Sequence, residues 1–93
     1  MNIIFDKEKN KKLKKERGVS FEVIIEKMAE EKIILDFSHP DAERYPNQRI
    51  MVIEINEYPY CVPYLQEKDK IILKTIYPDR RFKRFLKPGE RNE

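Results

Sequence analysis

Hydrophobic residues recur along the chain at spacings that predict helices first and strands afterwards. The segment after Ser20 has apolar residues at positions i, i+3, i+4, i+7 and i+8, which are Phe21, Ile24, Ile25, Met28 and Ala29. This spacing gives an amphipathic helix one apolar stripe. Ser20 is a favourable residue just before the first helical position. We therefore expect a helix here that packs its apolar face on a sheet.

A more polar helix is expected before it, from about Asp6 to Arg17. Asp6 can accept hydrogen bonds from the free N–H groups of a helix start, and Gly18 can adopt the left-handed conformation that ends a helix. Leu13 is almost the only large apolar residue of this helix, so packing alone would hold it poorly. The apolar run "NIIF" before Asp6 predicts a short N-terminal strand.

The rest of the chain predicts strands and turns. After Lys32, "IILDF" indicates a strand, and "SHPDAERYPNQ" has the composition of a long loop. Short polar turns separate three further segments, "RIMVIEIN", "YPYCVPYL" and "KIILKTIY", which predict an antiparallel meander. Pro59 and Pro63 lie four residues apart, so their missing N–H groups would face the same edge of the middle strand. One neighbour of that strand must therefore pair loosely or bulge.

These patterns together predict an α+β fold. We expect a small antiparallel sheet, made of the three-stranded meander plus the short N-terminal strand. Two N-terminal helices would pack on it, and a short basic helix would follow it. A chain of 93 residues can bury one modest core. Residues 1–86 would form this single domain, and residues 87–93 would be a flexible tail.

Charge changes the picture because the positive residues are clustered, although the formal net charge is only +3. One basic block is "KEKNKKLKKER", residues 7–17, and the other lies near the C-terminus, from residue 80 to residue 91. Such asymmetry predicts an acidic partner, either nucleic acid or an acidic protein surface. The candidate RNA-binding residues from the two blocks are Lys11, Lys12, Lys15, Arg17, Lys83 and Arg84.

Several kinds of site are not expected. Cys61 is the single cysteine, which permits no internal disulfide, and one Cys with one His makes a structural metal site unexpected. The two glycines, Gly18 and Gly89, are too far apart to form a phosphate-binding loop. We expect no cofactor and no metal. No apolar run approaches the roughly 18 residues that span a membrane, and no secretory signal is visible, so we expect a cytoplasmic protein with no membrane partner.

Two residues are candidates for moving protons. His39, the single histidine, can act as a general acid or base. We favour the simpler interpretation, in which this loop histidine makes a local hydrogen bond beside Pro40. Tyr64 shares one strand face with Tyr58 and Tyr60 and can donate a phenolic proton or stack on a base. Aromatic residues on one strand face usually belong to a core, and we favour that interpretation.

The basic residues after the last predicted strand carry the most specific chemistry. Guanidinium groups held on a fixed scaffold suit phosphate oxygens, although solubility also accounts for such clusters. RNA cleavage without a metal needs a group that deprotonates the 2′-hydroxyl, cations that stabilise the phosphorane, and a proton for the leaving 5′-oxygen. Arginine, lysine and tyrosine can largely supply these roles.

The order of the motifs resembles that of the BrnT family of bacterial toxins. The resemblance runs from Ile3 to Leu86: a charged helix ends in "RGVSFE", an acidic loop and a hydrophobic meander follow, and the domain ends in "IYPDRRFKRFL". It implies a fold similar to RelE-type ribonucleases. It also implies a toxin that cleaves mRNA, inhibits translation and growth, and is neutralised by a smaller antitoxin with a DNA-binding domain.

The resemblance also suggests roles for particular residues. Arg80 falls on the family's arginine after the last strand, Arg81 on the basic residue beside it, and Lys74 in the strand leading to them. We expect these three to act on the transition-state phosphate, with His39 or Tyr64 handling protons. An antitoxin would then mask Arg80 and Arg81. The alternative is a non-catalytic module that binds nucleic acid or an acidic antitoxin.

Overall fold

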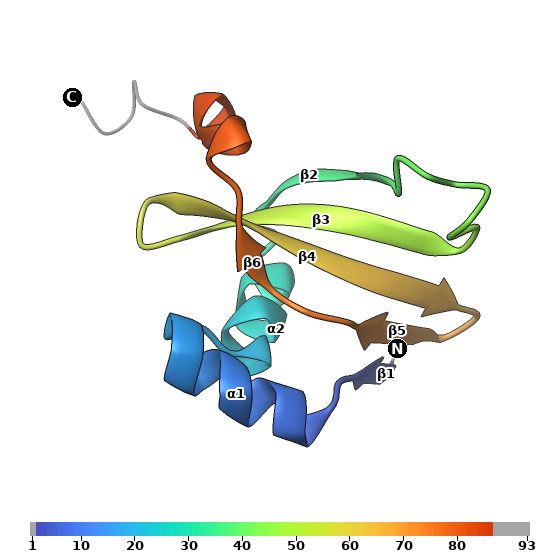
Figure 1. Ribbon diagram of the computed structural model, residues 1–93, viewed down its shortest axis with the longest axis horizontal. Helices are drawn as coiled ribbons and strands as arrows, with labels where there is room; N and C mark the ends of the chain where they lie inside the picture. Colours follow the sequence, from blue (N-terminus) through green and yellow to red (C-terminus); the bar gives the residue numbers. More distant parts are fainter. Residues whose placement is uncertain (1, 87–93) are drawn as a thin grey trace.

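The computed structural model describes residues 2–86, so the expected tail, residues 87–93, lies outside the described residues. Along the chain come β1 (Asn2–Ile4), α1 (Lys7–Arg17), α2 (Phe21–Ala29), β2 (Ile33–Ser38), β3 (Gln48–Ile55), β4 (Tyr58–Glu67), β5 (Lys70–Leu73), β6 (Tyr77–Pro78) and a 3₁₀ helix, η1 (Arg80–Phe85) (Figure 1). The α+β class is confirmed. Within the described range, no helix is long and apolar enough to cross a membrane.

The strands form one mixed sheet in the order β1-β5-β4-β3-β2, and β6 pairs with β4 beside β5. The predicted antiparallel meander is confirmed as β3, β4 and β5, but the expectation for the rest of the sheet is wrong in two respects. The "IILDF" segment joins the sheet as β2, antiparallel to β3, and β1 pairs with β5 in parallel. The alternation of side chains fixes which face of a strand is buried, but it does not encode which neighbour the strand takes or in which direction.

Both predicted helices are confirmed, with their expected end residues. Asp6 Oδ1 accepts from the Lys9 N–H at 2.9 Å, and Ser20 Oγ accepts from the Val23 N–H at 3.2 Å. Gly18 ends α1 with φ of 68°, in the left-handed region that only glycine adopts without strain. The local sequence signals therefore set where both helices begin and where α1 ends.

The first helix is held by polar contacts that compensate for its single large apolar residue. Asn10 is buried, and its carboxamide accepts from the Phe21 N–H at 2.8 Å and donates to Glu22 Oε1 at 2.8 Å. This contact with Asn10 is also the largest cause of the lowered pKa of Glu22. At the other end of α1, the Arg17 guanidinium donates to the Ile76 carbonyl. These bonds join α1 to α2 and to the end of the sheet.

Each face of the sheet carries its own apolar cluster. The larger cluster lies under α1 and α2 and includes Leu13, Phe21, Ile24, Val62 and Tyr64. The core interpretation of Tyr64 is confirmed, because this residue is only 3% exposed. The smaller cluster lies on the opposite face, where Ile50, Val52 and Cys61 are packed against Leu35, Phe37, Tyr77 and Phe82. Part of this second face is covered by η1, which contributes Phe82 to the smaller cluster.

The prolines of β4 interrupt its pairing with the last part of the chain, as their spacing predicts. The carbonyls of Pro63 and Pro59 accept from the Lys74 and Asp79 N–H groups at 2.9 and 3.1 Å, but neither proline can donate in return. Between these points the strand breaks into β5 and β6, and residues 75 and 76 stand opposite residue 62. This extra residue is a bulge. The β3–β4 pairing on the other side runs without a register shift.

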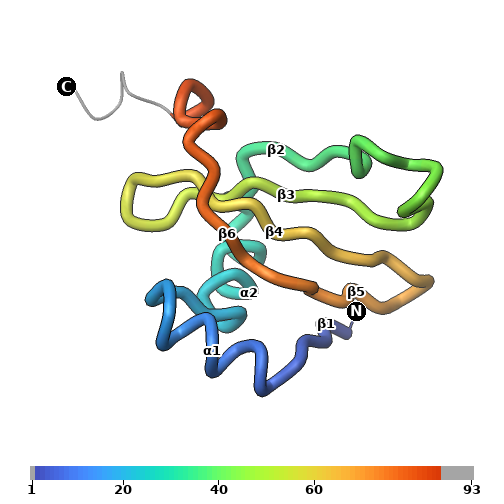
Figure 2. The backbone as a smooth tube through the Cα atoms, in the orientation of Figure 1, coloured from blue at the N-terminus to red at the C-terminus, as the bar shows by residue number. Residues whose placement is uncertain are grey.

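The bulge sends the chain out of the sheet and up to η1. Figure 2 follows the tube from β5 across the sheet to η1, which lies away from α1 and α2. The long β2–β3 loop and the β3–β4 turn lie at opposite ends of the sheet in the same view. The predicted short basic C-terminal helix is thus present as two turns of 3₁₀ helix.

We expect Asn10→Ala to lower the free energy of unfolding by about 2 kcal/mol, because the buried Phe21 N–H would lose its acceptor. Alanine has the higher helix propensity, so a loss of stability can only come from the broken contacts. Thermal unfolding measures the effect, and Lys12→Ala on the exposed side of α1 is the matched control. Equal melting temperatures for the two variants would contradict the role of Asn10.

Candidate functional site

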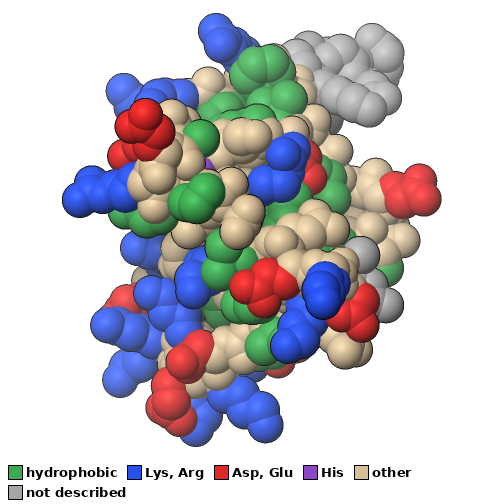
Figure 3. Space-filling model, turned by 90° about the vertical axis from the view of Figure 1, so that its right-hand side faces the viewer, with side chains coloured by type: hydrophobic (Ala, Val, Ile, Leu, Met, Phe, Trp, Pro, Cys, Tyr) green, Lys and Arg blue, Asp and Glu red, His purple; other side chains and the backbone are tan. Residues whose placement is uncertain are grey.

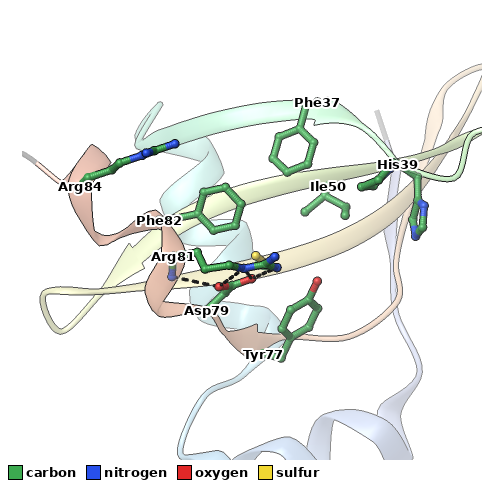
Figure 4. A pocket seen from close by; sticks show the side chains of 10 residues that line it. Phe37, His39, Ile50, Tyr77, Asp79, Arg81, Phe82 and Arg84 are labelled. Carbon is green, nitrogen blue, oxygen red and sulfur yellow. Dashed lines mark hydrogen bonds and ion pairs between the residues drawn. The ribbon is translucent and has the colours of Figure 1, made fainter.

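The candidate site is a cavity of about 450 Å³ on the sheet face opposite α1 and α2, which we call the sheet pocket. It has an apolar floor, and polar groups from two separate parts of the chain surround that floor. Phe37, Ile50 and Cys61 form part of the floor, and the polar residues around it are His39, Tyr77, Asp79, Arg81 and Arg84. Figure 4 shows His39 and Arg84 at opposite ends, with Arg81 and Tyr77 between them.

The backbone of β4 places η1 over this face. Asp79 is fixed by its N–H bond to Pro59 and caps η1 by accepting from the Arg81 N–H at 3.0 Å. Side chains three residues apart eclipse in a 3₁₀ helix, so Arg81 and Arg84 both reach the sheet pocket. Phe82 packs beside Phe37, with ring centroids 5.9 Å apart. Arg81 and Arg84 therefore lie on the same side of η1.

Asp79 and Arg81 form a bidentate ion pair within the pocket. Arg81 Nη2 donates to Asp79 Oδ2 at 2.7 Å, and Nε donates to Oδ1 at 3.0 Å. The carboxylate is only 9% exposed, whereas the Arg81 side chain is 81% exposed. The hydrogen bond to Arg81 is the main reason that the pKa of Asp79 is lowered and that of Arg81 is raised. Both groups are therefore charged at neutral pH.

His39 makes the local hydrogen bond that we favoured, and it also faces the pocket. Its Nδ1 accepts from the Asp41 N–H at 3.0 Å, and its ring packs on Tyr45 with centroids 4.4 Å apart. An Nδ1 that accepts a bond carries no proton, so the neutral ring has its N–H at Nε2. In this form His39 can donate a hydrogen bond to a ligand through Nε2, while its Nδ1 already accepts from the Asp41 N–H.

Two groups in the pocket are neutral at physiological pH, and partial removal from water raises the pKa of each further. Burial raises the pKa of the Cys61 thiol to about 11, and the Asp79 carboxylate adds to the shift. Burial also raises the pKa of Tyr77, and the neighbouring Cys61 adds to that shift. Tyr77 is thus a phenolic donor, and Cys61 is an uncharged part of the floor.

Tyr64 belongs to a separate polar network on the other face of the sheet. Its hydroxyl donates to both oxygens of Asp36, at 2.8 and 2.7 Å, and Arg49 Nε donates to Asp36 Oδ1 at 3.0 Å. Burial, followed by the hydrogen bond to Asp36, raises the pKa of Tyr64 to about 12. A phenol with such a pKa is no base near neutral pH. The structure does not bring Tyr64 to the same place as His39.

The remaining predicted residues are scattered. Arg80 is exposed and outside the pocket lining, and Lys74 lines a different cavity, of about 410 Å³, together with Lys9. Lys83 Nζ lies 5.6 Å from the centroid of the Tyr58 ring, and the Arg17 guanidinium donates to the Ile76 carbonyl. Three other predicted residues project from α1 on the opposite side of the sheet, and these are Lys11, Lys12 and Lys15. Of the predicted set, only His39, Arg81 and Arg84 meet in the sheet pocket.

Sequence reasoning missed Asp79, Tyr77 and Phe37 as parts of the site. Asp79 precedes two arginines and follows a proline, which is a recognisable N-cap signal for a short helix. Tyr77 and Phe37 carry no such signal, because their place depends on the bulge after β5 and on the pairing of β2. Local patterns do not contain that information.

The charge on one side of the molecule is mixed. Figure 3 views the molecule from the right-hand side of Figure 1 and shows acidic side chains interleaved with lysines and arginines. Over the described residues, no group of three or more His, Cys, Asp and Glu side chains is arranged to hold a metal ion. What the sheet pocket offers is an apolar floor and several hydrogen-bond donors, two of which are guanidinium groups.

Comparisons of the chain with protein-family models, with curated proteins and with solved structures find no match. The resemblance to BrnT toxins therefore rests on the sequence motifs alone. It stays a prediction.

We expect Cys61 to react slowly with iodoacetamide in the folded protein, because only the thiolate attacks and a pKa of about 11 leaves little of it at pH 8. The rate should be about 100-fold below that of the same protein in urea. It should rise about tenfold for each pH unit until the pH approaches the pKa. Mass spectrometry of timed samples measures both. Equal rates for folded and unfolded protein would show that the Cys61 thiol in the pocket floor is accessible to solvent.

Proposed function

We propose that this protein acts on single-stranded RNA as a metal-independent endoribonuclease of the toxin type, and that the RNA strand enters the sheet pocket. One observation carries the proposal: Arg81, Arg84 and His39 come from two distant segments and line the same pocket, over an apolar floor. Unstacked bases bind apolar and aromatic surfaces, and guanidinium groups bind the adjoining phosphates. This combination favours a single strand over a duplex.

In the proposed reaction the 2′-hydroxyl attacks the adjacent phosphorus as its proton passes to His39 Nδ1. The 5′-oxygen leaves with a proton from the Tyr77 hydroxyl, which water then replaces. Arg81 and Arg84 would stabilise the charge that builds on the phosphorane oxygens. The Nε2–H of His39 and the Tyr77 hydroxyl would donate hydrogen bonds to phosphate oxygens. The oxygens of Asp79 already accept from Arg81, and His39 Nδ1 accepts from Asp41. Proton removal from the 2′-hydroxyl would therefore require the His39–Asp41 contact to open.

The hydrogen bond that His39 Nδ1 already accepts from Asp41 favours a second candidate function, which is RNA binding without cleavage. Among the described side chains of the sheet pocket, each strong proton acceptor is already engaged by a donor. A pocket of donors binds a phosphate without needing a base. In both cases we propose, from the resemblance to BrnT toxins and the basic η1, a cognate antitoxin with a DNA-binding domain. Its acidic surface would cover the sheet pocket, since one positive surface attracts both acidic partners.

The test is incubation of the purified chain with a long single-stranded RNA in chelator, alongside Arg81→Ala and Arg84→Ala. Lys12→Ala, on α1, is the control for loss of a positive charge from the opposite side of the sheet. We expect discrete fragments ending in 2′,3′-cyclic phosphate, formed about 10²-fold more slowly by each arginine variant. The Lys12→Ala rate should stay close to that of the wild type.

Each other outcome has a definite meaning. Intact RNA that is bound at low salt, with affinity lost in Arg81→Ala, would exclude cleavage and leave the binding function. Cleavage that Arg81→Ala and Arg84→Ala retain in full would place the reaction outside the sheet pocket. Absence of both binding and cleavage at low salt would contradict each candidate function.

A further inference from the structure

We propose that Asp79 is a positioning residue for RNA binding: it holds Arg81 so that one edge of the guanidinium faces a phosphate in the sheet pocket. The inference rests on the proposed function and concerns a residue that contacts no RNA itself. It predicts that removing the negative charge of Asp79 weakens RNA binding. Simple electrostatics predicts the opposite, since a carboxylate beside a phosphate site would ordinarily weaken binding.

The geometry of the pair carries the argument. Arg81 donates to Asp79 through Nε and Nη2, and within residues 2–86 the structure gives Nη1 no acceptor. A guanidinium has donors on more than one edge, so the pair leaves Arg81 able to donate to a ligand oxygen while its orientation is fixed. Figure 4 shows this guanidinium lying across the middle of the pocket, between Phe82 and Tyr77.

Asp79 is itself held more firmly than an ordinary surface carboxylate. Its N–H donates to the Pro59 carbonyl of β4, and its Oδ1 also accepts from the Arg81 N–H. The side chain is 9% exposed, so it has little room to follow a mobile arginine. The arginine, which is 81% exposed, would otherwise sample many rotamers. Asp79 thus holds the exposed Arg81 guanidinium in one orientation relative to the sheet.

This arrangement lowers the entropy lost when RNA binds, because the arginine is ordered before the ligand arrives. Arg84 provides a contrast within the same pocket. Its guanidinium lies over the exposed Phe85 ring at 4.9 Å, and no carboxylate in the described range is paired with it. We therefore expect Arg81 to be the more specific of the two phosphate contacts.

The experiment is a fluorescence-anisotropy titration with a labelled eight-nucleotide 2′-O-methyl oligouridine, which cannot be cleaved through its 2′ position. The variants are Asp79→Asn, Arg81→Ala and the double variant. Asparagine keeps an oxygen that can cap η1, so η1 should stay folded. Glu57→Gln, in the exposed β3–β4 turn, is the control for loss of one negative charge.

We expect Asp79→Asn to weaken binding about fivefold, although it removes a negative charge. In the Arg81→Ala background the same change should instead tighten binding about twofold, because only the repulsion of the phosphate by Asp79 remains. Glu57→Gln should leave the affinity unchanged or slightly higher. Arg81→Lys, which keeps the charge but cannot form the bidentate pair, should weaken binding as much as Asp79→Asn.

A purely structural role for Asp79 would weaken binding to the same extent in both backgrounds, and that result would overturn the proposal. Tighter or equal binding by Asp79→Asn in the wild-type background would also overturn it, while leaving RNA binding itself intact. Failure of the wild type to bind the oligonucleotide at low salt would overturn the RNA site and the role of Asp79 together. Binding by the wild type separates these two kinds of failure.

Discussion

The two prolines of β4 are the constraint on which the rest of the site depends. Each proline accepts one hydrogen bond from the last part of the chain and returns none, so the final strand cannot run beside β4 as a regular ladder. The chain responds with a bulge, and this bulge has two consequences. The Ile76 carbonyl is free to accept from Arg17, which secures α1, and Asp79 is fixed at Pro59, where η1 begins.

A consequence of this route is that the two basic blocks lie on opposite sides of the sheet. The lysines of α1 project from the helix-covered side, while η1 carries Arg81 and Arg84 to the other face. A ligand in the sheet pocket meets the second block directly. The first block can then serve another acidic surface, or keep the helix solvated where its only buried residues are Asn10 and Leu13.

The sequence predicted much of the fold because the relevant signals were local. Asp6, Gly18 and Ser20 marked helix ends, and Pro59 with Pro63 predicted irregular pairing on one edge of β4. The parallel pairing of β1 and the place of β2 at the sheet edge could not be predicted, because pairing partners are chosen by tertiary packing. The motif "RGVSFE" also acts locally. Its glycine and serine lie at helix ends, and its arginine and glutamate make contacts within the fold.

The same reasoning explains why the candidate site was predicted only in part. Arg84 was found from the clustering of positive residues, and Arg81 was found from the family resemblance. His39 reaches the same pocket because β2 lies beside β3, and Tyr64 is directed to the opposite face by strand alternation. Of the two motifs behind the family resemblance, "RGVSFE" makes contacts within the fold, whereas "IYPDRRFKRFL" supplies Tyr77, Asp79, Arg81 and Arg84 to the sheet pocket. The proposed chemistry rests on the second motif and on His39.

The most direct test of this account is a nuclear magnetic resonance titration of the ¹⁵N-labelled protein with a short, uncleavable single-stranded RNA. The account predicts that the largest amide shift changes fall at residues 37–39 and 77–84, on the face that carries the sheet pocket. Changes confined to residues 7–17, with the pocket unaffected, would contradict it and assign RNA binding to α1.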